Sequence, residues 1–235
     1  MVNGVTIEIA CGSIDDVLVC NNYPVDRIEL TMGLELGSIT ASVGELKRAK
    51  QVSKIPMCCM VRHRGGKLWC SEEGKKVMIL DAEELLKAGA DGIVFGFIDA
   101  KEHRVIKSWT KEMVDLIHSY GKEAIFHKAS DQTPDFKECI EDLIECGVDR
   151  VLTSGQKPKA ELLDGCKIID EYRLKYGDKI QFLPGGGITS ENIKEVVKIS
   201  GCNQLHMTCK KINQEEGFTY VDGDTINEFL AALGN

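Results

Sequence analysis

Short apolar runs alternate along this chain with longer segments in which apolar residues recur every three or four positions. Runs of four to six residues rich in Val, Ile, Leu and Phe are typical of buried strands. The segments between them have the spacing of helices that cover such strands. The predicted strands are Thr6–Ala10, Arg27–Thr31, Pro56–Val61, Gly92–Phe97, Glu123–His127, Arg150–Thr153, Ile180–Leu183 and Gln204–Met207.

Polar residues mark where the predicted helices begin, and glycines mark where they end. Ser13, Ser71 and Ser190 each precede an acidic stretch, so we expect their hydroxyls to cap helix N-termini. Glycine after a helical segment and before a strand is a typical helix stop. Such stops are expected at Gly89, Gly147 and Gly177.

The repeat of strand, helix and glycine indicates a parallel α/β protein. Eight such units in 235 residues fit a closed (β/α)8 TIM barrel, and no linker or composition break divides residues 1–235, so we expect a single domain. The alternative, an open doubly wound sheet that binds dinucleotides, needs a Gly-x-Gly-x-x-Gly turn after the first strand. That motif is missing there, so we expect no nucleotide cofactor.

The composition narrows the choice of partners. Thirty-seven Asp and Glu against 29 Lys and Arg leave a net charge of −8, which disfavours nucleic acid and anionic membrane surfaces as partners. The chain has no apolar run of membrane-spanning length, and its first residues lack the features of a secretory signal. We therefore expect a cytoplasmic protein.

Several polar residues are predicted at the carboxyl ends of the strands, where TIM barrels carry their active sites. Carboxylates inside apolar strands are seldom buried unless they are paired. One interpretation is structural: Glu8 and Glu29 form an ion pair with Arg62 that fills the barrel. The other is that the carboxylates and imidazoles converge on one pocket and do acid–base chemistry. The catalytic candidates are Glu8, Glu29, His127, His206 and Asp131.

Cations and glycines gather at the same predicted end of the barrel. Arginine and lysine could bind a small anion, and glycine lets backbone N–H groups approach one, although a glycine run is also typical of a tight turn. The candidate anion-binding residues are Arg62, Arg64, Lys128, Ser154, Gly185, Gly186 and Gly187.

Ten cysteines in a reducing compartment are expected to be free thiols, and most of them to be packing residues. No Cys-x-x-Cys motif occurs, and the adjacent Cys58 and Cys59 should point to opposite faces of a strand. Cys11 and Cys209 fall at strand ends, where their thiolates could bind a soft ion such as Cu(I).

The chain resembles the CutC family of copper homeostasis proteins over nearly its whole length. The resemblance implies a TIM barrel, a cytosolic location, a homodimer or higher homo-oligomer, and a role in copper handling. It is carried by Glu8–Cys11, Asp26–Leu30, Arg62–Gly66, Asp91–Gly96, Phe126–Asp131, Arg150–Gln156, Pro184–Ile188 and His206.

The chain departs from the family pattern at several positions. Thr31 stands where the family has a second cysteine, so one thiol of the pair invoked for Cu(I) is missing. His63 and Lys67 replace a proline and an acidic residue, and Lys128 replaces an arginine, exchanging a bidentate fork for a point charge. Ser130 replaces an aromatic residue.

Two functions remain open at this stage, and the sequence does not decide whether the protein is an enzyme. The first is copper homeostasis, with Cu(I) bound by Cys11 together with Cys209 or His206. The second is a lyase, isomerase or epimerase that acts on a small carboxylated or phosphorylated metabolite, with Glu29 and His127 as the acid–base pair.

Overall fold

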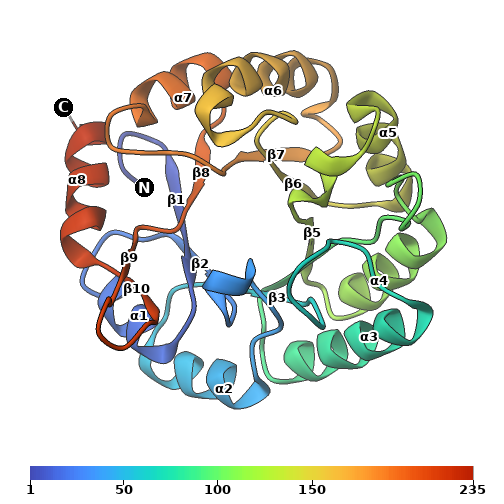
Figure 1. Cartoon of the computed structure of the whole chain (residues 1–235), viewed down its shortest axis with the longest axis horizontal. Helices are drawn as coiled ribbons and strands as arrows, with labels where there is room; N and C mark the ends of the chain where they lie inside the picture. Colours follow the sequence, from blue (N-terminus) through green and yellow to red (C-terminus); the bar gives the residue numbers. More distant parts are fainter. Residues whose placement is uncertain (235) are drawn as a thin grey trace.

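Eight parallel strands form a ring, and helices surround it (Figure 1). The computed structural model describes residues 1–234. The strands follow one another in the order β7-β6-β5-β4-β3-β2-β1-β8, and a parallel bridge between Gly185 and His206 joins the two ends of this sheet. The predicted (β/α)8 barrel is therefore confirmed.

The strands lie where the apolar runs predicted them, and their ends differ by at most two residues. The barrel strands are β1 (Thr6–Cys11), β2 (Arg27–Leu30), β3 (Met57–Met60), β4 (Gly92–Phe95), β5 (Glu123–Phe126), β6 (Arg150–Thr153), β7 (Gln181–Pro184) and β8 (Gln204–Met207).

The helices follow the strands in turn. They are α1 (Ile14–Cys20), α2 (Val43–Val52), α3 (Glu72–Lys87), α4 (Lys107–Ser119), α5 (Phe136–Cys146), α6 (Leu162–Tyr176), α7 (Ile193–Ser200) and α8 (Gly223–Gly234). Three short 3-10 turns lie in the loops at Leu34–Leu36, Lys128–Gln132 and Lys159–Glu161.

Two of the three predicted serine caps are confirmed. The hydroxyls of Ser13 and Ser71 accept hydrogen bonds from the backbone N–H groups of Asp16 and Gly74. The prediction for Ser190 is wrong, because α7 begins only at Ile193. The side chain of Asn192 instead bonds back to the Thr189 N–H, at 2.8 Å, and holds a turn ahead of the helix.

The predicted glycine stops all lie at helix ends. Gly147 caps α5 in the left-handed conformation, with φ of 82°, which is the geometry that favours glycine there. Gly89 directly follows the last residue of the α3 cap, also with positive φ, and Gly177 caps α6 in a right-handed conformation.

Apolar side chains fill two regions. The larger region lies between the strands and the helices, and it includes Cys59. A small second cluster lies inside the barrel on β3, β4 and β5, and it includes Cys58, so the predicted opposite orientation of the two thiols is confirmed. The complete interior cluster is Cys58, Met60, Val94 and Ile125.

A hairpin after β8 was not predicted. It consists of β9 (Lys210–Ile212) and β10 (Thr219–Val221), and it lies beside α1. The N–H of Val221 donates to the buried carboxylate of Asp16 at 2.7 Å, which fixes the hairpin to that helix. Each strand has only three residues, and those of β9 are all exposed, so apolar alternation could not reveal the hairpin.

Every helix in the described residues is too short or too polar to pass through a membrane.

Candidate functional site

A buried ion-pair network occupies the barrel interior between β1, β2 and β8. The register pairs Glu8 with Arg27 on one side and with His206 on the other. Nδ1 of His206 donates to one carboxylate oxygen of Glu8 at 2.7 Å, and Nε of Arg27 donates to the other. Arg27 also donates to the side chain of Gln204 at 3.0 Å. The predicted pairing of Glu8 with an arginine is therefore present, but the partner is Arg27 and not Arg62.

Glu29 completes this network from β2. One of its carboxylate oxygens lies 3.9 Å from Nδ1 of His206, and the residue is 3% exposed. Among the described residues, Glu8, Glu29 and His206 form the only trio whose candidate ligand atoms all lie within 4.8 Å of one another. Because both oxygens of Glu8 are already occupied by hydrogen bonds, we interpret the trio as an acid–base network and not as a metal centre.

The surroundings separate the acidities of the two carboxyl groups. Burial alone would raise the pKa of Glu8, but the hydrogen bond from His206 and the charge of Arg27 lower it to about 2. Glu29 lacks such a hydrogen bond, so burial raises its pKa to about 7 despite the opposing charges of His206 and Arg27. Burial lowers the pKa of His206, but Glu29 and Glu8 outweigh this and hold that pKa above its usual value. Two carboxyls with separated pKa values beside an imidazolium can act as proton donor and acceptor.

Arg62 lies elsewhere, after the end of β3. Its guanidinium donates to the carbonyls of Gly37 and Ser38, at 2.6 and 3.0 Å, and to the carbonyl of Gly66 at 2.6 Å. Arg62 therefore ties two loops together. The expected ion pair between this arginine and the buried glutamates is wrong, because Arg27 precedes Glu29 by two residues on β2 and shares its face.

His127 follows β5 and has no hydrogen bond to the Glu8 network. Its Nδ1 accepts from the N–H of Ala129 at 3.1 Å. Burial and the neighbouring charge of Arg62 lower the pKa of His127 to about 4, so the ring is neutral. The structure thus places Glu29 beside His206, whereas the expected acid–base partner was His127.

A second polar group joins the loops after β5 and β6. The carboxylate of Asp131 accepts from the hydroxyl of Thr153, from the N–H and hydroxyl of Ser154, and from the N–H of Gln156. Nζ of Lys128 lies 3.3 Å from this carboxylate and 3.1 Å from the Ser154 hydroxyl. Asp131 is therefore saturated with donors and organises the loops.

The glycine run after β7 borders this second group. A side chain at Gly186 would collide with Lys128, and one at Gly185 would press against Leu152 and His206. Glycine at these two positions therefore lets the loop approach Lys128 and His206 closely. Gly187 has φ of 131°, a conformation that other residues rarely adopt.

Cys11, which the sequence predicts as a soft-metal ligand, has as its neighbour Cys20, one of the cysteines expected to be packing residues. Sγ of Cys11, on the outer face of β1, lies 3.6 Å from Sγ of Cys20, at the end of α1. Burial, followed by the hydrogen bond between the two thiols, raises the pKa of Cys11 well above its ordinary value. Burial raises the pKa of Cys209 to about 12, and the nearby Cys20 thiol adds to this. The helical spacing of α1 could have indicated this pairing, because it turns Cys20 toward β1.

A cavity of about 310 Å³ borders the residue next to Cys11 in the sequence, although neither thiol lines it. It lies between the loop after β1, the turn at Leu34–Leu36 and the β9–β10 hairpin, and its wall includes Gly12, the residue after Cys11. Three carboxylates, those of Asp15, Asp16 and Glu35, line it. The cavity is therefore suited to attract cations.

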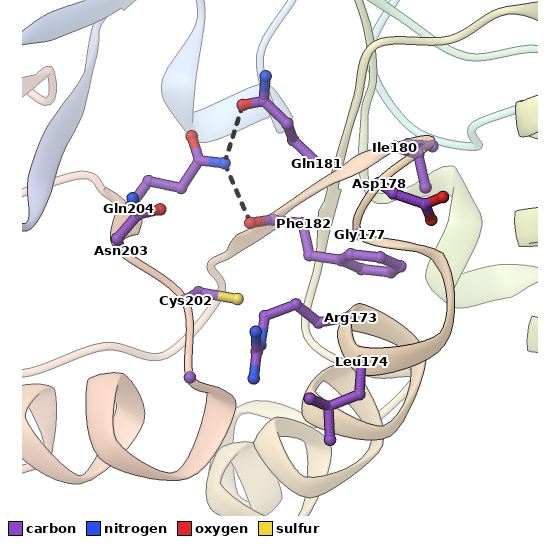
Figure 2. A pocket seen from close by; sticks show the side chains of 11 residues that line it. Arg173, Leu174, Gly177, Asp178, Ile180, Gln181, Phe182, Cys202, Asn203 and Gln204 are labelled. Atoms are coloured by element: carbon purple, nitrogen blue, oxygen red, sulfur yellow. Dashed lines mark hydrogen bonds between the residues drawn. The ribbon is translucent and has the colours of Figure 1, made fainter.

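A larger cavity, of about 760 Å³, lies at the opposite end of the barrel, at the start of β7 and β8 (Figure 2). There the side-chain amide of Gln204 donates to the side chain of Gln181 at 3.3 Å and to the Phe182 carbonyl at 3.1 Å. None of the predicted site residues lines this cavity. The amino-terminal end of a TIM barrel serves stability, so size alone does not make this cavity the functional site.

The fold and the interior define the class of protein: a (β/α)8 barrel with a buried Glu–His–Glu network inside and a thiol pair behind its first strand. Residues 5–211 match the model of the CutC family, and the chain belongs to this family.

Curated relatives agree with this assignment. A CutC family protein of Treponema denticola is 35% identical over 90% of this chain and 84% of its own length. The human copper homeostasis protein cutC homolog is 32% identical over 88% of this chain and 74% of its own length.

Solved structures agree on the fold. A CutC structure from Streptococcus agalactiae superposes with a TM-score of 0.79 at 24% identity, covering 86% of this chain and 97% of that one. Phosphoribosylanthranilate isomerase from Pyrococcus furiosus, with a TM-score of 0.60 at 13% identity, covers 97% of this chain and 98% of its own, and it shares the barrel alone.

Proposed function

We propose that this protein takes part in copper homeostasis in the cytoplasm by binding Cu(I) at Cys11 and Cys20, with Cys209 as a third thiol. The observation that supports this most directly is the 3.6 Å separation of the Cys11 and Cys20 sulfurs. Soft thiolates select Cu(I) over harder ions. Two metal–sulfur bonds of about 2.3 Å, the length found for zinc thiolates, span about 4 Å between sulfurs at trigonal angles. A small adjustment would therefore bring both sulfurs to one ion.

The surroundings support entry of a cation to this pair. All three thiols are buried, and burial raises the pKa of Cys11 and of Cys209, so an arriving ion must displace the protons of these two thiols. The acidic cavity beside Gly12 supplies a cation-attracting approach. Thr31 replaces the second family cysteine and is not part of this proposed site. Its hydroxyl donates instead to the Ile39 carbonyl at 2.8 Å.

The test is anaerobic titration with Cu(I) against a competing chelator. Loss of a residue that only supports a metal ligand weakens metal binding ~10–100-fold. Cys11 and Cys20 are proposed as direct ligands, so we expect Cys11→Ser and Cys20→Ser each to weaken Cu(I) binding by at least this factor. Cys166→Ser, a change of the same kind at a buried helical thiol, is the matched control and should leave affinity unchanged. Equal affinities for Cys11→Ser, Cys166→Ser and the wild type would contradict the proposal.

A second candidate function is acid–base chemistry on a small anionic metabolite, by a lyase, isomerase or epimerase. The observation that favours it is the buried trio in which Glu29, with a pKa of about 7, lies 3.9 Å from His206. A group with its pKa near the working pH is the most effective proton shuttle. An enzyme that moves a proton next to a carbonyl exchanges that hydrogen with solvent.

This candidate can be tested without knowing the substrate. Small carboxylates and sugar phosphates are incubated with the protein in D2O, and NMR follows the loss of C–H signals. We expect exchange on at least one compound, lost in Glu29→Gln and retained in Glu228→Gln, a change at an exposed helical glutamate. Exchange that persists in Glu29→Gln, or exchange on none of the compounds, would exclude the candidate.

A further inference from the structure

Two buried hydrogen-bond donors without a partner lie on the wall of one small cavity. Among the described residues, four buried side-chain nitrogen or oxygen atoms have no hydrogen-bond partner, and Nε of Arg62 and Nε2 of His127 are two of them. Both residues line the same cavity of about 10 Å³. Buried polar groups are nearly always paired, so two such atoms at one place need an explanation.

The chemistry of His127 makes its Nε2 a donor. Its Nδ1 accepts a hydrogen bond from the N–H of Ala129, so Nδ1 carries no hydrogen. The ring is neutral at physiological pH, which leaves the one hydrogen on Nε2. The ring is 4% exposed, and it lies over Gly96, where any side chain would collide with it. Gly96 therefore makes room for the imidazole.

Arg62 is held so that its Nε–H has a fixed direction. Its two terminal nitrogens donate to the carbonyls of Gly37, Ser38 and Gly66, whereas the buried Nε–H has no partner. The residue is 5% exposed. Arg62 and His127 line the same small cavity, and the charge of Arg62 contributes to the lowered pKa of the His127 ring.

The rest of the cavity wall is basic. Arg64, Lys67 and His63 line it, and no carboxylate of the described chain does. The Arg64 guanidinium lies 5.3 Å from the ring centre of Trp69, and the Lys67 ammonium lies 5.8 Å from it. Both cations are exposed at the rim. Two donors inside and two cations at the rim are complementary to negative charge.

We propose that this cavity, the His127 cavity, binds one anionic oxygen of a small carboxylate or phosphate through Nε–H of Arg62 and Nε2–H of His127. A space of about 10 Å³ admits a single oxygen atom, so the rest of the ligand lies at the rim beside Arg64 and Lys67. This inference rests on the second candidate function, for which it names the anchoring group of the substrate. His127 is then a binding residue and not the proton shuttle.

The test uses formate, acetate, inorganic phosphate and chloride as probes at constant ionic strength. NMR of the histidine ring nitrogens follows the Nε2–H signal of His127 during each titration. We expect this signal to shift and saturate with formate or phosphate; tighter binding of one of them identifies the anchoring group as carboxylate or phosphate. Equal affinity for chloride would overturn the assignment to an oxygen anion. A signal that no probe moves would mean that the donors bind water alone, and would overturn the site.

Variants make the test specific. His127→Phe should weaken binding on the order of 10–100-fold, the value of a hydrogen bond to a charged group. Its control, His118→Phe, alters a half-exposed histidine on α4. Arg64→Gln, at an exposed position where folding is not at risk, should weaken binding about twofold to fivefold, while the equally exposed Arg48→Gln should not. Unchanged affinity in both His127→Phe and Arg64→Gln would overturn the proposal.

The outcomes separate the two hypotheses. Anion binding at His127 without Glu29-dependent hydrogen exchange removes the enzymatic function and keeps the site. If the Nε2–H signal of His127 in the wild type responds to no probe, and hydrogen exchange persists in His127→Phe, the anion site is refuted and the enzymatic function stands.

Discussion

Stability of this protein should fall as pH rises from 5 to 8, because Glu29 is buried in the form that carries a proton. Burial raises the pKa of Glu29 from its ordinary value of 4.5 to about 7. The folded state therefore binds more protons than the unfolded state between these values, and the free energy of unfolding decreases as pH rises through them. The whole difference, at about 1.4 kcal/mol for each pKa unit, corresponds to about 3 kcal/mol.

His206 acts in the same direction. Glu29 and Glu8 raise its pKa above the ordinary 6.5, so its contribution to stability is complete below pH 6.5 and is lost as pH rises through the folded-state value. The wild-type protein should therefore lose on the order of 3 kcal/mol or more of unfolding free energy between pH 5 and pH 8 from these two groups.

The variant Glu29→Gln isolates the carboxyl. Glutamine carries no charge at any pH, so the variant should match the wild type near pH 5 and exceed its stability by about 2–3 kcal/mol at pH 8. Urea unfolding at pH 5, 6, 7 and 8 measures this, with Glu228→Gln as the exposed control. A wild-type stability that stays constant over this range, or a constant difference between Glu29→Gln and the wild type, would refute the buried, protonated carboxyl.

Three further outcomes follow from the contacts. The first concerns acid pH: because the pKa of Glu8 is lowered, its stabilising effect is complete above pH 4.5 and is lost as pH falls toward about 2. Glu8→Gln should therefore lower the free energy of unfolding by about 3 kcal/mol at pH 7 and by little at pH 2, as measured by urea unfolding. Asp131→Asn should cost about 2–3 kcal/mol by the same assay, because an amide cannot accept every hydrogen bond that this carboxylate receives from Thr153, Ser154 and Gln156; a cost below 0.5 kcal/mol would show that the loops hold without it. Thr31→Cys, which restores the family residue, should cost about 1 kcal/mol, since the hydroxyl bond to Ile39 is lost, and a more stable variant would contradict this.

The sequence predicted the parts of the structure that depend on strand order and alternation. Because β8, β1 and β2 are neighbours in a closed barrel, Glu8, Glu29 and His206 had to lie close together once the fold was known. The same alternation indicates Arg27, which shares a face with Glu29 but stands at the first position of its strand, away from the carboxyl end where TIM barrels carry their active sites.

Other contacts depend on packing that no pattern along the chain encodes. The approach of Cys20 to Cys11 depends on how α1 turns against β1. The three carbonyls that hold Arg62 belong to loops whose conformations follow from glycines at positive φ and not from apolar spacing. Asp131 appeared to be a candidate base, and only the structure shows that its carboxylate is used by two loops.

The distance between the His127 cavity and Glu29 sets the minimum length of any substrate that reaches both. Glu29 is level with Cys58 in the strand register, and Arg62 follows Cys58 by four residues toward the carboxyl end. At about 3.3 Å per residue, and with the strands inclined by about 36°, this places Arg62 roughly 10 Å higher along the barrel axis. The apolar side chains of Met60, Val94 and Ile125 lie in the interior on the His127 side between these levels.

A molecule anchored by one oxygen in the His127 cavity can therefore present a reacting carbon to Glu29 only if it extends about 10 Å from its anionic end. Formate and acetate are too short, so they should bind to the wild type and to Glu29→Gln equally, and they should undergo no hydrogen exchange. A sugar phosphate or a long-chain oxo acid has the required reach. Such compounds are the ones in which exchange is expected, because only they connect the cationic side of the mouth to the acid–base network on β1, β2 and β8.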